Sequence, residues 1–158
     1  MQGRAPRGLA RGRAAFSLLE LLITLGLISI VLATAAIAWP RVDAALQLDA
    51  GLHQIAGDLH AAQTLAIASA SRVRVVFPVG ADVYQRERMD DAGNYQPDLT
   101  RRLPSGIQIV AANSGGDLVF SARGQGENGT VTLGDRQGVH RGVRLNQRGR
   151  VTILPVGP

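Results

Sequence analysis

One acidic side chain stands at the start of the longest apolar stretch of the chain. Glu20 comes four residues after Phe16, and residues 21–39 carry no charged side chain. At about 1.5 Å of rise per residue, a helix over this stretch crosses the roughly 30 Å hydrocarbon core of a bilayer. A carboxylate in hydrocarbon costs ~3 kcal/mol or more. Glu20 is therefore expected either to reach the headgroup layer or to meet a cationic partner.

The other groups that do chemistry in proteins are scattered. His53, His60 and His140 are the only histidines, and the first two lie two helical turns apart, too far to share one metal ion without further ligands. They are expected to be exposed to solvent. The chain has no cysteine and no Gly-x-Ser-x-Gly sequence, so no nucleophile–base pair is visible. We expect no enzymatic activity, no metal site and no cofactor.

Residues 124–129 (GQGENG) match the glycine spacing of dinucleotide-binding loops. Such a loop must lead into the N-terminus of a helix, where the backbone N–H groups hold the phosphates. The residues that follow, 130–133 (TVTL), have the composition of a strand instead. We therefore interpret this glycine pattern as a turn.

Arginines gather near the C-terminus, with Asp135 as the only neighbouring acid: Arg136, Arg141, Arg144, Arg148 and Arg150. Of these, Arg144, Arg148 and Arg150 are candidates for contact with DNA phosphates or other anions. Sites for single-stranded nucleic acid usually add aromatic side chains for stacking, and this segment has none. The alternative is a charged sheet edge that discourages aggregation.

Glu20, His53 and His60 lie in one long predicted helix. Residues 16–40 form its apolar, transmembrane half, and Pro40 is expected to kink or unwind it locally because proline has no backbone N–H. Residues 41–70 form an amphipathic half that must cover a sheet. Its apolar stripe has spacings of four and three residues: Leu48, Leu52, Ile55, Leu59 and Ala62.

The remaining segment, residues 71–158, changes to the alternating pattern of strands. Residues 72–77 alternate before Pro78, and short strand candidates follow between turns rich in glycine and asparagine. This spacing predicts an antiparallel meander, with residues 89–103 as a long surface loop. The absence of cysteine means that the core alone must hold this domain together.

Most of the excess positive charge belongs to residues 1–15, which form a polar leader. The chain has a net charge of +5, and the leader contributes four arginines and no acid: Arg4, Arg7, Arg11 and Arg13. The basic isoelectric point is therefore weak evidence for nucleic-acid binding. Arginines on this flank place the N-terminus in the cytoplasm and the C-terminal domain across the membrane.

The sequence of residues 14–22 (AAFSLLELL) resembles the processing site of type IV pilins and type II secretion pseudopilins. In that family a small residue, usually Gly, precedes Phe, and Glu is the fifth residue of the mature chain. The resemblance implies cleavage between Ala15 and Phe16 by a prepilin peptidase, N-methylation of Phe16 and a role in assembly for Glu20. Ala15 stands where the family usually has Gly, which bears on the efficiency of cleavage.

A second resemblance covers residues 58–154. Phe120 followed by Gly124, and Gly149-Arg150-Val151 near the end, are similar to the globular domain of the minor pseudopilin H family and its type IV pilus relatives. The resemblance implies a pilin-like α+β fold, in which a long N-terminal helix packs on an antiparallel β-sheet domain in the periplasm.

The implied function is that of a minor pseudopilin of the type II secretion system. Such a subunit is anchored by a single span in the bacterial inner membrane and joins other pseudopilins in the tip region of the periplasmic pseudopilus, which drives export of folded proteins across the outer membrane. The alternative is a minor pilin of a type IV pilus that binds DNA through the basic C-terminal patch. The lack of cysteine, and of aromatic residues in the patch, favours the first.

A different targeting signal also has to be considered. Residues 33–38 (ATAAIA) contain Ala-x-Ala patterns after an apolar run, as a signal peptidase site does. Cleavage there would release a soluble periplasmic protein that starts near Ala36 or Trp39. Glu20 argues against this interpretation because an ordinary signal peptide gains nothing from an acid in its apolar segment.

The two interpretations predict different mature N-termini. We expect the membrane-extracted protein to begin at Phe16, because this cut leaves an amine one helical turn from Glu20. Intact-mass measurement or N-terminal sequencing decides the point. A soluble product that begins near Ala36 or Trp39 would rule out the pilin-like interpretation.

Overall fold

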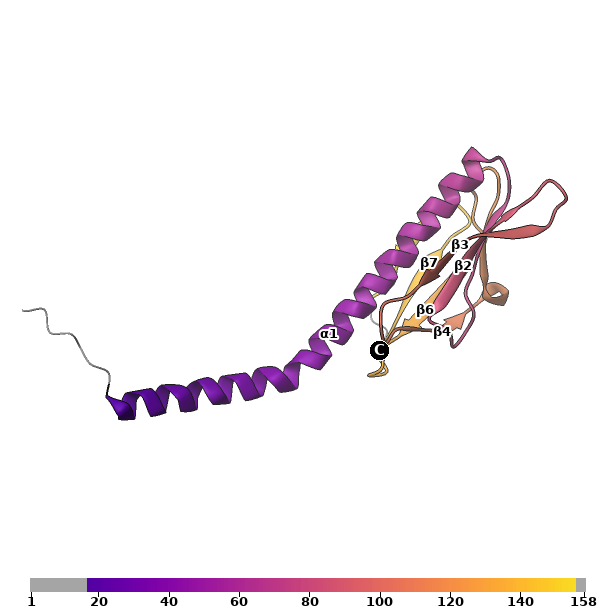
Figure 1. Ribbon diagram of the computed structural model, residues 1–158. Helices are drawn as coiled ribbons and strands as arrows, with labels where there is room; N and C mark the ends of the chain where they lie inside the picture. Colours follow the sequence, from indigo (N-terminus) through magenta and orange to yellow (C-terminus); the bar gives the residue numbers. More distant parts are fainter. Residues whose placement is uncertain (1–16, 156–158) are drawn as a thin grey trace, which may run out of the picture. The chain divides into compact units, whose positions relative to one another are not determined.

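The structure is a computed structural model that describes residues 17–155 (Figure 1). In chain order its elements are α1 (Leu18–Ala68), β1 (Val73–Val76), β2 (Val83–Met89), β3 (Tyr95–Arg102), β4 (Gln108–Ala112), the 3-10 helix η1 (Ser114–Gly116), β5 (Asp117–Phe120), β6 (Gly129–Gly134), β7 (His140–Leu145) and β8 (Val151–Ile153). Trp39 and Pro40 mark the boundary between two compact units, and each is described by itself.

The first unit contains the apolar part of α1. Its side chains are exposed on every face of the helix, and this part is long and apolar enough to cross a membrane. The hydroxyls of Thr24, Ser29 and Thr34 each donate a hydrogen bond of 2.8–2.9 Å to a backbone carbonyl three or four residues earlier. These polar groups are therefore satisfied within the helix itself, which is what a hydrocarbon environment requires.

The second unit is built around the part of α1 that follows Pro40, and the helix continues through this proline. The predicted apolar stripe is confirmed, because its members are at most 2 % exposed and Ala66 extends it: Leu48, Leu52, Ile55, Leu59 and Ala62. Gly51 is buried on the same face. A Cβ atom there would lie 3.3 Å from Cδ1 of Leu133, so the glycine lets β6 approach the helix.

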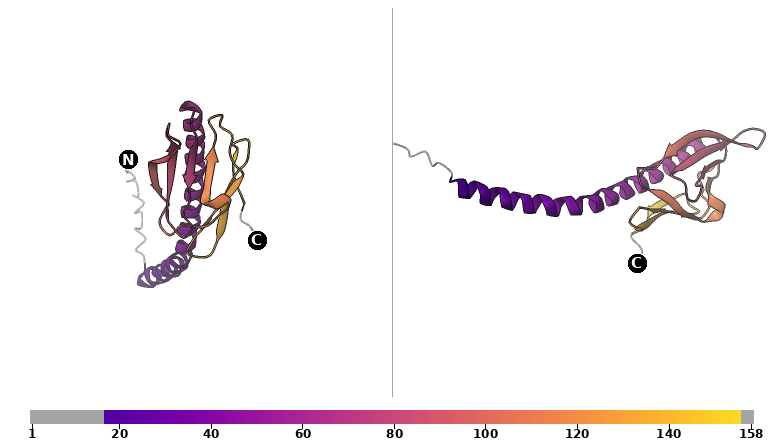
Figure 2. Two further views of the ribbon diagram at one scale, coloured as in Figure 1. Left: turned by 90° about the vertical axis from the view of Figure 1, so that its right-hand side faces the viewer. Right: turned by 60° about the horizontal axis from the view of Figure 1, so that its bottom comes forward.

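Two antiparallel four-stranded sheets cover this stripe. The first has the strand order β3-β2-β1-β5 and the second the order β4-β6-β7-β8. Figure 2 shows their strands on either side of α1. Both sheets contribute inward-facing side chains to a single core: Val73, Val75, Phe77, Tyr84, Leu118 and Phe120 from the first sheet and its flanks, and Ile109, Val131, Leu133, Val143 and Leu145 from the second.

The fold class is as expected, but two details of the sequence-based prediction are wrong. Residues 89–103 do not form a long surface loop, because Tyr95–Arg102 is strand β3, paired with β2. This edge strand is mostly exposed, so its composition is polar, and Pro97 lies just after a shift in register. The strands also do not form one meander: β5 adds to the far side of β1, and β4 pairs with β6.

Two loops meet beside Gln63, near the end of α1. The Gln63 side-chain amide donates a 2.8 Å hydrogen bond to the carbonyl of Gly124, in the loop between β5 and β6. Gly149, in the turn between β7 and β8, has a φ of +74°. A Cβ atom on Gly149 would collide with both the Gln63 amide and the Gly124 carbonyl. Gly149 is therefore needed for its backbone conformation and for its lack of a side chain.

The junction gives a stability test with a matched control. We expect Gly149→Ala to lower the free energy of unfolding more than Gly138→Ala. Both glycines have a positive φ, which costs an alanine roughly 1–2 kcal/mol. A Cβ on Gly138 meets nothing within 4 Å, whereas one on Gly149 adds an overpacking cost of ~1–3 kcal/mol. Thermal unfolding of the full chain in detergent measures the difference, and equal losses in the two variants would contradict the close packing at Gly149.

Candidate functional site

The start of α1 is built by Ser17. The Ser17 hydroxyl accepts a 3.1 Å hydrogen bond from the backbone N–H of Glu20, and the Ser17 carbonyl accepts one from Leu21. Ser17 is therefore the N-cap, and Ser-x-x-Glu has the spacing of a capping box. A carboxylate in the first turn also interacts favourably with the positive end of the helix dipole.

The Glu20 side chain is exposed at this first turn. Between residues 17 and 155, no hydrogen bond or ion pair to its carboxylate is found, so the group is available to an outside partner. Phe16 and Ala15, the residues of the expected cleavage and N-methylation, lie outside the described residues. The processing site therefore stays a prediction from the sequence.

The three candidate arginines of the basic patch are all exposed. Arg144 lies on β7, opposite Thr130 and Thr152 in the neighbouring strands. Arg148 and Arg150 belong to the turn between β7 and β8, where the side-chain oxygen of Asn146 accepts both of their backbone N–H groups at 3.0 and 2.9 Å. No ion pair of these three arginines is found within the described part of the chain.

The other candidate groups do not form a site. His53, His60 and His140 are exposed, as predicted, and residues 17–155 contain no group of three or more side chains suited to hold a metal ion. The glycine pattern at 124–129 leads into strand β6, which confirms its interpretation as a turn.

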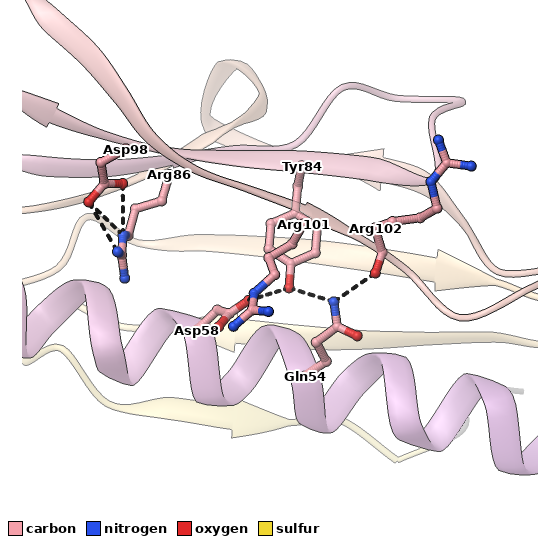
Figure 3. A network of polar contacts seen from close by, with 7 residues as sticks. All are labelled: Gln54, Asp58, Tyr84, Arg86, Asp98, Arg101 and Arg102. Atoms are coloured by element: carbon pink, nitrogen blue, oxygen red, sulfur yellow. Dashed lines mark hydrogen bonds and ion pairs between the residues drawn. The ribbon is translucent and has the colours of Figure 1, made fainter.

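The sequence analysis missed a network that joins α1 to β2 and β3 (Figure 3). The Tyr84 hydroxyl donates a 2.6 Å hydrogen bond to Asp58 and accepts a 3.1 Å bond from the side-chain amide of Gln54. The same Gln54 amide donates to the backbone carbonyl of Arg102 at 2.9 Å, and Arg101 lies 3.5 Å from the Asp58 carboxylate. The sequence feature that could have predicted this network is the pair Gln54 and Asp58, which lie one turn apart beside the apolar stripe.

The network also controls the ionisation of Tyr84. Burial raises the pKa of this phenol well above its ordinary value near 10, and the hydrogen bond to Asp58 raises it further. The folded domain thus holds the phenol in its neutral, hydrogen-donating form. The network is a structural clamp between helix and sheet and contains no nucleophile or metal ligand set.

Comparison with protein families decides what the chain is. Residues 52–149 match the family described as type II transport protein GspH, which is more than half of the 158-residue chain. The chain belongs to the GspH family. Residues 10–36 also match the prokaryotic N-terminal methylation motif. A comparison with curated protein sequences found no match.

Solved structures show the same fold. The minor pseudopilin EpsH from the type 2 secretion system of Vibrio cholerae is similar with a TM-score of 0.60 and 13% identity, covering 71% of this chain and 96% of that one. The type IV minor pilin FimU of Pseudomonas aeruginosa gives a TM-score of 0.54 and 15% identity, covering 68% and 88%. At these identities the likeness concerns the fold alone.

This GspH-family chain is a minor pseudopilin of the type II secretion kind, a structural protein and not an enzyme. Membership of the family implies assembly with other pseudopilins and processing from a prepilin form. The apolar N-terminal helix and the methylation motif agree with an anchor in the inner membrane.

The clamp predicts a stability difference that depends on pH. Near neutral pH we expect Tyr84→Phe to lower the free energy of unfolding by roughly 1–3 kcal/mol, since Asp58 and Gln54 lose a partner. The folded-state pKa of Tyr84 is raised, so above pH ~10 only the unfolded wild type releases this proton. The wild type then loses stability with rising pH, and the gap between the two proteins narrows.

Thermal unfolding in detergent between pH 7 and about pH 11 measures this gap. Tyr95→Phe is the control, because no hydrogen bond of the Tyr95 hydroxyl is found among residues 17–155; its ring contacts Arg74. A constant gap across this pH range, or an equal loss in the control, would show that the Tyr84 hydroxyl does not act as described.

Proposed function

We propose that the chain takes a place in the tip region of the periplasmic pseudopilus and assembles there with other, different pseudopilins. Such a filament drives export of folded proteins across the outer membrane. The observation that supports this proposal most directly is the exposed Glu20 carboxylate in the first turn of an apolar helix capped by Ser17. Within residues 17–155 this carboxylate has no partner, although it lies in a segment suited to hydrocarbon.

The partner follows from processing. Cleavage between Ala15 and Phe16 by a prepilin peptidase creates an amine, and N-methylation of Phe16 keeps it cationic. In hydrocarbon, an isolated ammonium and an isolated carboxylate are each costly, so the amine of one subunit and Glu20 of its neighbour attract strongly. This ion pair fixes the step between adjacent helices in the filament.

Orientation follows from the charges on either side of the apolar run. The leader carries four arginines and no acid, which favours a cytoplasmic location for the N-terminus. The domain after Pro40 then lies in the periplasm. It has no cysteine, so its stability depends on the core around α1 and not on disulfides.

A second candidate function is that of a type IV minor pilin that binds DNA. The observation in its favour is the exposure of Arg144, Arg148 and Arg150 without ion pairs in the described chain. Against it, Phe77, Tyr84 and Phe120 are buried, and the half-buried Tyr95 ring is already covered by the Arg74 guanidinium, 4.0 Å from its centroid.

The proposal predicts the behaviour of substitutions at Glu20. We expect Glu20→Ala to be processed and inserted into the membrane but to assemble poorly, because the cation of the neighbour stays unpaired at a cost of about 3–5 kcal/mol. Glu20→Asp keeps the charge with a shorter reach and is expected to be intermediate. The assembly of Glu20→Gln is expected to be closer to that of Glu20→Ala than to that of Glu20→Asp. Crosslinking to partner pseudopilins, together with a secretion assay, measures assembly.

Ser17→Ala is the matched control. It removes the N-cap hydrogen bond, worth ~1 kcal/mol, and keeps the carboxylate. A strong defect in Ser17→Ala together with a mild one in Glu20→Gln would mean that Glu20 acts through helix capping. Normal assembly and secretion of Glu20→Ala would show that the carboxylate only reaches the headgroup layer.

A further inference from the structure

The fold brings arginines from three separate parts of the chain to the end of the globular domain where α1 finishes. Arg123 lies in the loop between β5 and β6, Arg148 and Arg150 lie in the turn between β7 and β8, and Arg72 precedes β1. All four are exposed. We call them the distal arginine surface, since they lie at the opposite end of the domain from Pro40.

The two arginine-bearing loops are held against each other. The backbone N–H of Gly126 donates to the carbonyl of Gln147 at 3.3 Å, which joins one loop to the next. Gly149 packs without free space against Gln63 and Gly124, so the helix holds both loops in place. The backbone that carries Arg123, Arg148 and Arg150 is therefore fixed before any partner arrives.

Each loop is also stiffened internally by a polar side chain. The Ser121 hydroxyl accepts the backbone N–H groups of Arg123 and Gln125 at 3.4 and 3.2 Å. Asn146 does the same for Arg148 and Arg150. A preorganised surface loses little conformational entropy on binding, which favours recognition.

A cleft opens beside the first of these loops, between β5 and β6. It has a volume of about 540 Å³, and Arg72 and Arg123 line it together with Gln125. Asp90 and Asp91, from the turn between β2 and β3, line it as well. The Asp90 carboxylate accepts hydrogen bonds from the Asn94 backbone and the Gln96 side chain, and the Asn94 bond contributes most to lowering the pKa of Asp90. Asp90 thus stabilises the turn between β2 and β3.

Several arginines on the sheets, by contrast, have acidic partners. Arg74, Arg86 and Arg141 pair with Glu87, Asp98 and Asp49. No ion pair of the distal arginine surface is found in the part of the chain that the structure describes, although Glu127 lies near Arg72 in an adjoining cleft. Among residues 17–155 the surface thus presents four arginines that form no ion pair, two of them in a cleft that Asp90 and Asp91 also line.

We propose that the distal arginine surface docks an acidic face of the next pseudopilin subunit. This inference rests on the proposed function, and it adds where a neighbour binds and with which charge. A protein partner is favoured over nucleic acid because a protein loop can enter the cleft, and the described residues that line it include no aromatic side chain on which bases stack. Complementary charge also steers the partner to this end of the domain.

Photo-crosslinking in cells that express the full chain tests the inference. A photoreactive amino acid in place of Gln125 reports on the cleft, and one in place of Leu27 reports on contacts of the membrane helix. We expect a crosslink from position 125 to another pseudopilin, identified by mass spectrometry. The double variant Arg123→Glu/Arg148→Glu is expected to lower its yield at least about tenfold, since like charges then face each other.

Arg136→Glu is the matched control. Arg136 is also exposed, and it lines clefts at the Pro40 end of the domain. It should leave the yield at position 125 unchanged, and neither variant should change membrane insertion or the melting temperature. Equal losses in the two variants, or no loss in the double variant, would overturn the inference. A nuclease-sensitive crosslink from position 125 would overturn it in favour of DNA binding.

Crosslinks from positions 27 and 125 distinguish a failure of this inference from a failure of the proposed function. A pseudopilin captured from position 27 but not from position 125 would overturn only the docking site. Capture from neither position would contradict assembly itself, and the docking inference would be lost with it.

Discussion

Burial of one face of α1 after Pro40 is the constraint on which the globular domain depends. Burying a leucine or isoleucine side chain contributes about 1.5–3 kcal/mol, and the stripe places Leu48, Leu52, Ile55 and Leu59 against both sheets. Since a domain of this size is stable by only about 5–15 kcal/mol in total, neither sheet has a substitute for the helix. The sheets are arranged around α1 and share a core that it completes.

The polar contacts at the edges of this core orient the helix in addition to stabilising the domain. Arg141 on β7 binds Asp49 at 2.9 Å, while Tyr84 on β2 binds Asp58 at 2.6 Å. The partly exposed Arg141–Asp49 ion pair contributes little free energy, about 0–1 kcal/mol, whereas loss of the Tyr84 hydrogen bonds costs roughly 1–3 kcal/mol. Both contacts also position the helix: one fixes α1 along the second sheet and the other fixes it along the first. Together with Gln63, they determine the rotation of the helix about its axis.

The sequence predicts what depends on local pattern. The stripe of α1 follows from its spacing of three and four residues, and the turn at 124–129 follows from the strand after it. Strand β3 was missed because an exposed edge strand has polar residues on both faces. The clamp at Tyr84 and the junction at Gly149 were missed for another reason: each joins segments that are distant in the chain, and only the packing brings them together. The loop of Arg123 meets the turn of Arg148 and Arg150 in the same way.

Glu20 combines two roles that differ in size. Its backbone N–H donates to the Ser17 hydroxyl in the first turn of α1, an N-cap contact worth ~1 kcal/mol that any short polar cap provides. In the proposed filament it pairs with the amine of a neighbour, where an unpaired charge costs several times more. Capping alone does not explain an acid at this point, because Ser17 already satisfies the Glu20 N–H and a glutamine at this position would serve the same box. In the proposed filament the ion pair would therefore be the larger effect, and the cap positions the carboxylate at the first turn of α1.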